Sequence, residues 1–97
     1  MLCNYRIFDD NNICLGVAWL RRVEQHLYFL SFITIYKQFR GKGYGKLLLG
    51  IILKDAKKEN IHIELKVDSF GKMSHNELIN WYEKQGFVRI EGNLLRN

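Results

Sequence analysis

The sequence predicts an α+β protein with a mostly antiparallel mixed sheet flanked by helices, in the order β-β-β-α-β-α-β. Three observations support this fold class. Apolar runs rich in β-branched and aromatic residues open the chain, two helical patterns follow, and an alternating strand pattern lies between the two helices. The 97 residues, of which 47% are hydrophobic, suffice for a single compact domain over residues 1–97.

Three strands are expected first, over residues 2–8, 13–20 and 27–36. An Asp/Asn turn at residues 9–12 predicts that the first two form a hairpin. Residues 21–26 separate the second strand from the third, so an antiparallel meander is expected.

A helix is predicted over residues 46–58, with lysines toward its C-terminal end, where cations suit the helix dipole. Apolar residues recur there at helical spacing: Leu47, Leu48, Ile51 and Ile52. The segment 61–68 then alternates strictly between apolar and polar residues, which predicts a half-buried strand. Its polar side includes Glu64.

The second helix begins with a capping box, because Ser74 and Glu77 have the S-x-x-E spacing. Leu78, Ile79 and Tyr82 give it an apolar face, and the glycine at position 86 predicts its end. The last residues, 87–97, are expected to form one short strand or two.

Composition limits the function classes. Fifteen basic and ten acidic residues give a net charge of +5, which suits an anionic partner: nucleic acid, an acidic surface or a phosphorylated small molecule. No apolar run approaches the length of a membrane span, and the first residues do not resemble a secretion signal, so a cytoplasmic protein that does not enter membranes is expected. Cys3 and Cys14 are expected to be reduced thiols, and the scattered histidines predict no metal site.

The most informative segment is "QFRGKGYGKLLLG", residues 38–50, which has glycines at every second position before an apolar helix. Glycines let a backbone approach a ligand closely, and the first N–H groups of a helix have no partners within the helix. Together with the positive end of the helix dipole, such groups bind phosphate. The surrounding cations are Lys37, Arg40, Lys42 and Lys46. A flexible basic turn is the simpler alternative.

The dinucleotide and Walker A patterns both fail here, whereas R-x-x-G-x-G fits as Arg40, Gly43 and Gly45. Between a strand ending "FITI" and an apolar helix, this pattern resembles motif A of the GNAT superfamily of N-acetyltransferases. A second stretch also resembles that superfamily, a helix ending in Tyr-Glu-Lys-x-Gly-Phe at residues 82–87. The resemblance covers nearly the whole chain, which begins at what is usually the family's second strand, without the preceding strand and helices.

The resemblance implies a GNAT-like acyl-CoA N-acyltransferase fold and acetyl-CoA as co-substrate, with no metal. The implied pyrophosphate contacts are Arg40, Gly41, Lys42, Gly43, Tyr44, Gly45 and Lys46. The implied pantetheine contacts are Ile33, Thr34 and Ile35, where a strand N–H also polarises the thioester carbonyl. Asn76 is a further coenzyme contact, Tyr82 the proton donor to the leaving thiolate, and Glu64 a candidate base.

The leading hypothesis is an acetyl-CoA-dependent N-acetyltransferase that moves an acetyl group to a primary amine by direct attack. The amine belongs to an unidentified small molecule or protein, and a homodimer is compatible with the short chain. Two alternatives remain: a catalytically idle CoA-binding subunit, and a small basic nucleic-acid-binding module. The aromatic residues that the nucleic-acid hypothesis needs for stacking are Tyr28, Phe29, Tyr36 and Phe39.

Overall fold

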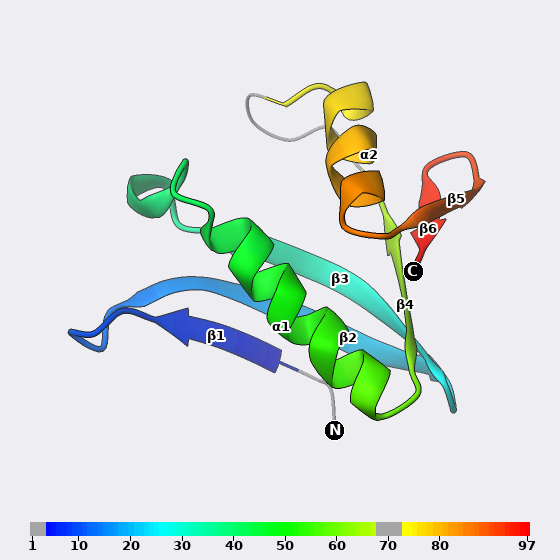
Figure 1. The fold of residues 1–97 in the computed structure, drawn as a ribbon, viewed down its shortest axis with the longest axis horizontal. Helices are drawn as coiled ribbons and strands as arrows, with labels where there is room; N and C mark the ends of the chain where they lie inside the picture. The colour runs from blue at the N-terminus through cyan, green and yellow to red at the C-terminus, as the bar shows by residue number, and fades with distance from the viewer. Residues whose placement is uncertain (1–3, 68–72) are drawn as a thin grey trace.

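A computed structural model describes residues 4–67 and 73–97. Six strands form one mixed sheet in the order β1-β2-β3-β4-β6-β5, and two helices pack on it (Figure 1). All neighbouring strands are antiparallel except β3 and β4, which are parallel, so the predicted α+β class and mostly antiparallel sheet are confirmed. The elements are β1 (Asn4–Phe8), β2 (Cys14–Glu24), β3 (Leu27–Ile35), the 3-10 turn η1 (Lys37–Phe39), α1 (Tyr44–Lys58), β4 (His62–Lys66), α2 (His75–Lys84), β5 (Val88–Glu91) and β6 (Leu94–Arg96).

The N-terminal hairpin forms as predicted. The carboxylate of Asp9 accepts hydrogen bonds from the backbone N–H groups of Asn11 and Ile13, at 2.9 and 3.0 Å, and Asn12 has a positive φ of 67°. Asn tolerates this left-handed conformation better than most residues. The second strand is longer than predicted, because residues 21–24 continue it and pair with β3 instead of forming the connection.

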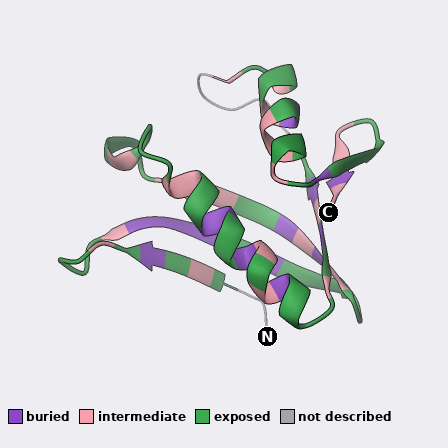
Figure 2. Cartoon of the chain, in the orientation of Figure 1, coloured by how far each residue is buried: buried purple, intermediate pink, exposed green. Residues whose placement is uncertain are grey.

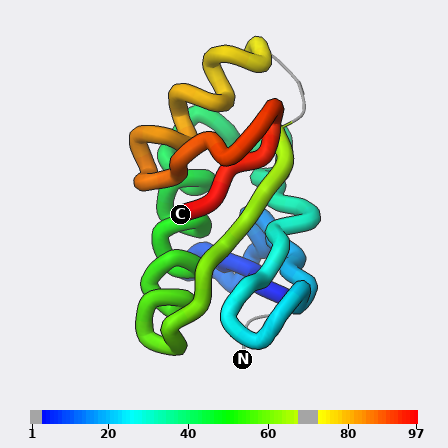
Figure 3. The backbone as a smooth tube through the Cα atoms, turned by 90° about the vertical axis from the view of Figure 1, so that its right-hand side faces the viewer, coloured from blue at the N-terminus to red at the C-terminus, as the bar shows by residue number. Residues whose placement is uncertain are grey.

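The helix α1 lies across β1, β2 and β3 on one side of the sheet, and α2 lies on the same side (Figure 3). The buried stripe of α1 repeats every third or fourth residue and consists of Leu48, Leu49, Ile52 and Ala56. The predicted apolar face was partly wrong, because Leu47 and Ile51 are 52% and 37% exposed. They fall outside the stripe that meets the sheet, which Figure 2 shows as buried patches along α1.

Strands β3 and β4 pair over a short distance only. Leu27, Tyr28 and Phe29 face His62, Ile63 and Glu64, and no further β3–β4 pair occurs among the described residues. Beyond this point β3 continues beside β2, while β4 continues beside β6, and the two strands diverge (Figure 1). The sheet therefore splays open between its two central strands.

The second helix begins at the predicted capping box. The Ser74 side chain accepts from the N–H of Glu77 at 3.3 Å, and the Glu77 carboxylate accepts from the N–H of Ser74 at 3.2 Å. The helix ends before Gly86, which has a φ of 101°, a left-handed conformation that glycine adopts without penalty. The C-terminal segment forms two strands, β5 and β6, and β5 is exposed throughout (Figure 2).

The alternation predicted for residues 61–68 is confirmed over β4, where Ile63 and Leu65 are buried and Glu64 faces the other side of the sheet. Position 68 lies outside the described residues, as does Cys3. Cys14 is a free thiol, partly buried at the start of β2. Within the described ranges, no helix has the length and apolarity needed to cross a bilayer.

Candidate functional site

The glycine loop leads from the end of β3 into α1. Gly41 and Gly43 have φ angles of 79° and 84°, in the left-handed region, where a residue with a Cβ is disfavoured by about 1–2 kcal/mol. Gly45 differs, because its φ is not positive and an added Cβ would meet Ile35 at 3.9 Å, an ordinary contact. The backbone therefore requires glycine at positions 41 and 43, whereas neither conformation nor packing requires it at position 45.

The backbone amides of this loop have no protein partner. From Gly41 to Lys46, six consecutive N–H groups find no acceptor among the described residues, and the first helical hydrogen bond joins Leu47 N–H to Gly43 C=O at 3.1 Å. Gly43 is the N-cap and brings no capping side chain. These groups lie at the positive end of a 15-residue helix. Free amides and the positive end of a helix dipole at one point are an arrangement that suits an anion.

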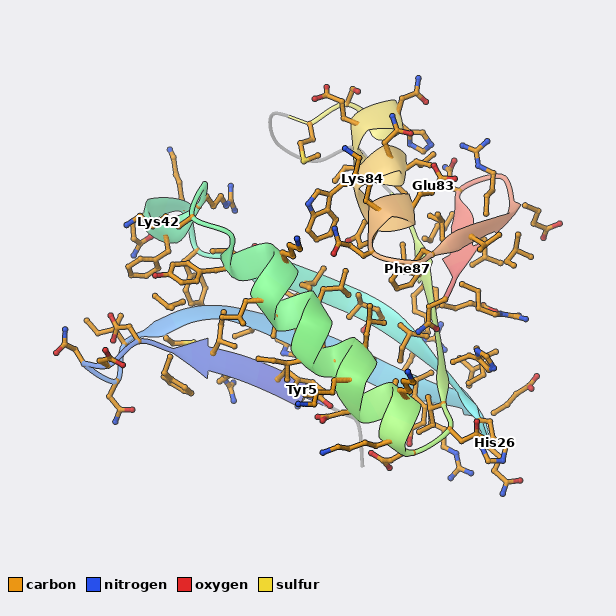
Figure 4. All side chains as sticks on the ribbon, in the orientation of Figure 1. Tyr5, His26, Lys42, Glu83, Lys84 and Phe87 are labelled. Atoms are coloured by element: carbon orange, nitrogen blue, oxygen red, sulfur yellow. The ribbon has the colours of Figure 1, made fainter. Side chains whose placement is uncertain are left out.

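The charges around the loop have the sign that an anion needs. Lys37, Lys42 and Lys46 are exposed around it, and the first turn of α1 contains no acidic residue. Lys42 lies in the loop that precedes α1 (Figure 4). Arg40 has a structural contact as well, because its Nε donates to the carbonyl of Ile35 at 2.7 Å. This bond fixes the loop to the end of β3.

The splayed edge of β3 presents backbone groups without strand partners. Tyr36 N–H donates to Leu15 C=O at 2.9 Å, and antiparallel alternation then directs the backbone groups of Thr34 toward β2 and those of Ile33 and Ile35 away from it. The side chains of Ile33 and Ile35 are partly buried against the core. Both isoleucines thus combine a packed side chain with backbone groups that face away from β2, although the Ile35 carbonyl already accepts from Arg40. Thr34, in contrast, has its amide directed toward β2.

Tyr82 lies on α2, packed against the core in a small aromatic group. Its ring centroid is 5.0 Å from that of Trp81 and 5.7 Å from that of Phe87, both in edge-to-face geometry. Burial raises the pKa of the Tyr82 hydroxyl, so this group stays protonated to a higher pH than an exposed tyrosine. His75 and Asn76 form the first turn of α2, in which Asn76 is exposed.

Glu64 occupies the last β3–β4 pair, opposite Phe29, where the splay begins. Its carboxylate accepts hydrogen bonds from Nε of Arg96, at 2.8 Å, and from Nη2 of the same guanidinium. Arg96 was not among the residues predicted from the sequence. Pairing of β6 with β4 decides this contact, and the short segment Leu94–Arg96 has no polar and apolar alternation that could have indicated it.

A hollow of about 450 Å³ follows the outer face of α1 from Gly43 to Lys54. It therefore starts at the loop but does not enter the splay. Across residues 4–67 and 73–97, no group of three or more His, Cys, Asp or Glu side chains could hold a metal ion.

The aromatic residues of the nucleic-acid hypothesis do not form a stacking surface. Tyr28 is buried and Phe39 packs against the core. The Phe29 ring carries the guanidinium of Arg21, 4.9 Å from its centroid, and Tyr36 is exposed at the end of β3.

A splayed sheet with an anion-binding loop at one end suits a protein that holds an extended phosphorylated ligand along a strand edge. Consistent with this class, residues 4–97 match the acetyltransferase (GNAT) domain family, and the chain belongs to that family. The general chemistry of this family is acyl transfer.

Comparison with solved structures supports the same fold. The anti-CRISPR protein AcrVA5 has a TM-score of 0.73 at 18% identity, with 99% of both chains covered. Tetrahymena GCN5 has a TM-score of 0.73 at 19% identity; 96% of this chain matches 65% of that one. N-acetylglutamate synthase from Neisseria gonorrhoeae, in complex with coenzyme A and N-acetyl-glutamate, has a TM-score of 0.73 at 17% identity. The match covers 97% of this chain and 25% of the synthase chain. Among curated proteins, none matches significantly.

Proposed function

We propose that the chain is an acetyl-CoA-dependent N-acetyltransferase that acts on a primary amine by direct attack. The observation that carries the proposal is the run of six unpartnered amides from Gly41 to Lys46, beside the unpaired edge of β3. Family membership and a family fold seen elsewhere with coenzyme A support it. When bound, acetyl-CoA supplies a thioester whose C–S bond breaks as the amine nitrogen forms the new C–N bond.

The loop holds the pyrophosphate in this proposal. Its amides, from Gly41, Lys42, Gly43, Tyr44, Gly45 and Lys46, donate to the phosphate oxygens, and the nearby lysines balance their charge. Arg40 positions the loop through its bond to Ile35 and presents its remaining guanidinium N–H groups to the anion. Asn76, exposed at the start of α2, remains a proposed polar contact to the coenzyme.

The open edge of β3 orients the thioester. The backbone groups of Ile33 and the N–H of Ile35 bond the pantetheine amides as an added strand does, while the Ile35 carbonyl stays bonded to Arg40. One strand N–H polarises the reacting carbonyl. Thr34 contributes through its side chain, because its amide faces β2.

Tyr82 and Glu64 have the acid and base roles in the proposed reaction. Thiols ordinarily have a pKa of about 8.5 and phenols a pKa of about 10, so full proton transfer from Tyr82 to the departing sulfur is unfavourable. Its contribution is an O–H···S hydrogen bond that stabilises negative charge on sulfur, and its raised pKa keeps that proton in place. Glu64 accepts the proton of the attacking amine, directly or through water, while Arg96 holds its carboxylate in position.

Two measurements test the function. Acetyl-CoA at about 100 times its Kd is expected to raise the free energy of unfolding by about 2.7 kcal/mol. Free thiol is expected to appear when a panel of primary amines is added, with one acetylated amine formed per thiol. Stabilisation without thiol release would support the idle CoA-binding alternative, and absence of stabilisation would contradict the site assignment itself.

A further inference from the structure

The sheet has a second face, opposite α1, which no described element covers over β1, β2 and β3 (Figure 3). On the α1 side, Ala18, Leu20 and Leu30 are buried. On the opposite face, Trp19 is 47% exposed and Phe32 is 43% exposed. Exposed aromatic side chains that lie together on a surface mark an interaction site more often than isolated ones do.

The aromatic residues on this face form an ordered pair. Trp19 and Phe32 are cross-strand neighbours, and their ring centroids lie 5.0 Å apart at an interplanar angle of 38°. Val17, two residues along β2, is only 6% exposed although it is not part of the main core cluster. This face therefore has a small apolar cluster of its own, which we call the aromatic patch: Val17, Trp19 and Phe32.

The aromatic patch is continuous with the candidate site. A row of residues in register crosses four strands on the same face, from β2 through β3 and β4 to β6: Arg21, Phe29, Glu64 and Arg96. Arg21 follows Trp19 by two residues, so the row lies directly beside the patch. Since Glu64 marks the start of the splay, a molecule resting on the patch reaches the unpaired edge of β3 from this face.

The charges that flank the patch are positive. Arg6 pairs with Val17, and Arg21 follows Trp19. The nearest acidic residue along β2 is Glu24, beside the turn to β3, and the Glu64 carboxylate is engaged by Arg96. Apolar aromatic residues with flanking arginines are the composition that protein interfaces favour.

We propose that this face docks an acidic polypeptide segment that carries the acceptor lysine. The proposal rests on the proposed N-acetyltransferase function and names its acceptor class. Neither of two hollows on the described surface, one along α1 and one at the β2–β3 turn that reaches Arg96, is lined by a residue of the aromatic patch. A small amine would have no enclosed pocket here, whereas a polypeptide can cover a flat surface.

Charge separates this occupant from the alternatives. A second copy docked by the same face would bring the arginines of two chains together, which like-charge repulsion opposes. Nucleic acid needs many cations along its backbone, but the lysine cluster of the chain lies on α1, on the other side of the sheet: Lys54, Lys57 and Lys58. Two arginines beside a hydrophobic patch suit a peptide that has both glutamates and apolar residues.

The test uses three acceptors and three variants of the 97-residue chain. The acceptors are lysine amide, a peptide with one lysine among glutamates and leucines, and a matched peptide in which arginines replace the glutamates. The variants are Trp19→Ser, Phe32→Ser and Arg21→Glu, all at exposed positions. Acetylation of the acidic peptide is expected to exceed that of the matched peptide in kcat/KM by about tenfold or more, and each variant is expected to lose about tenfold on the acidic peptide.

The same variants are expected to acetylate lysine amide at the original rate and to bind acetyl-CoA unchanged, which shows that they fold. Equal rates on all three acceptors, unaffected by the variants, would overturn the docking proposal and leave the proposed function intact. If no amine is acetylated, the proposed function fails, and direct binding of the acidic peptide then tests the docking surface by itself. Binding that is abolished by Arg21→Glu would support the docking surface although the chain is not an enzyme. The proposal would also be overturned if the chain bound single-stranded oligothymidine more tightly than the acidic peptide. A dimer of the original chain that is lost in Trp19→Ser would overturn it as well.

Discussion

A substitution at Gly45 can distinguish an effect on ligand binding from an effect on folding better than one at Gly41 or Gly43. Gly41 and Gly43 need their left-handed conformation, so any replacement there strains the backbone as well as the site. Position 45 is in the first turn of α1, and a Cβ there would make only an ordinary contact with Ile35. In the proposed function, close approach of a ligand to the backbone accounts for the glycine at this position.

Gly45→Ala is therefore expected to raise the free energy of unfolding of the ligand-free protein, by up to about 1 kcal/mol, while weakening acetyl-CoA binding by tenfold or more. Gly50→Ala is the matched control, since Gly50 lies in the same helix, is exposed, and has nothing within 4 Å of an added Cβ. It should stabilise the helix similarly and leave affinity unchanged. Urea unfolding and calorimetric titration measure both quantities. Unaltered affinity in Gly45→Ala would exclude the loop from the binding site.

Tyr82 allows a test with two readouts. Tyr82→Phe removes the hydroxyl and leaves the ring contacts with Trp81 and Phe87 in place. We expect kcat to fall by about 10²-fold while acetyl-CoA affinity is retained. A side chain that only fills the core would show full activity in this variant.

The second readout is stability at alkaline pH. Because burial raises the pKa of Tyr82 in the folded state, the unfolded chain loses this proton first, from about pH 10. The stabilisation is thus fully present below that pH and is lost as pH rises toward the folded pKa. In urea unfolding, Tyr82→Phe should lose less stability than the original chain between neutral pH and pH values above about 10.

At the scale of elements, the capping box decides how firmly α2 begins, and α2 carries both Tyr82 and Asn76. Ser74→Ala removes the acceptor for the Glu77 N–H and is expected to lower the free energy of unfolding by about 1 kcal/mol. Ser74→Asp keeps an acceptor at the same position and should retain most of the stability. Chemical denaturation compares the two, and equal losses in both variants would show that the cap contributes nothing.

Elements with local signals could be predicted from the sequence. The Asp9 turn, the Ser74 cap, the end of α2 at Gly86 and the glycine loop each depend on residues a few positions apart. The buried face of α1 was harder to predict, since the helix has six Leu and Ile residues and only contact with the sheet selects Leu48 over Leu47.

Across the whole molecule, the features that escaped prediction depend on strand register. The row from Arg21 to Arg96 exists because four strands align, and those strands come from segments far apart in the chain. The same holds for the Arg96–Glu64 pair and for the exposure of Trp19. Alternation assigns residues to two faces but cannot tell which face a helix will cover.

Strand pairing between the two halves of the sheet, β1 to β3 and β4 to β6, is limited to three residue pairs among the described residues, although one hydrophobic core spans both halves. A ligand lying along the diverging edges would bridge them as a missing strand would. Ligand binding would then add to the cohesion between the halves. A substitution that weakens the β3–β4 pairing is therefore expected to lower affinity without removing any contact to the bound molecule.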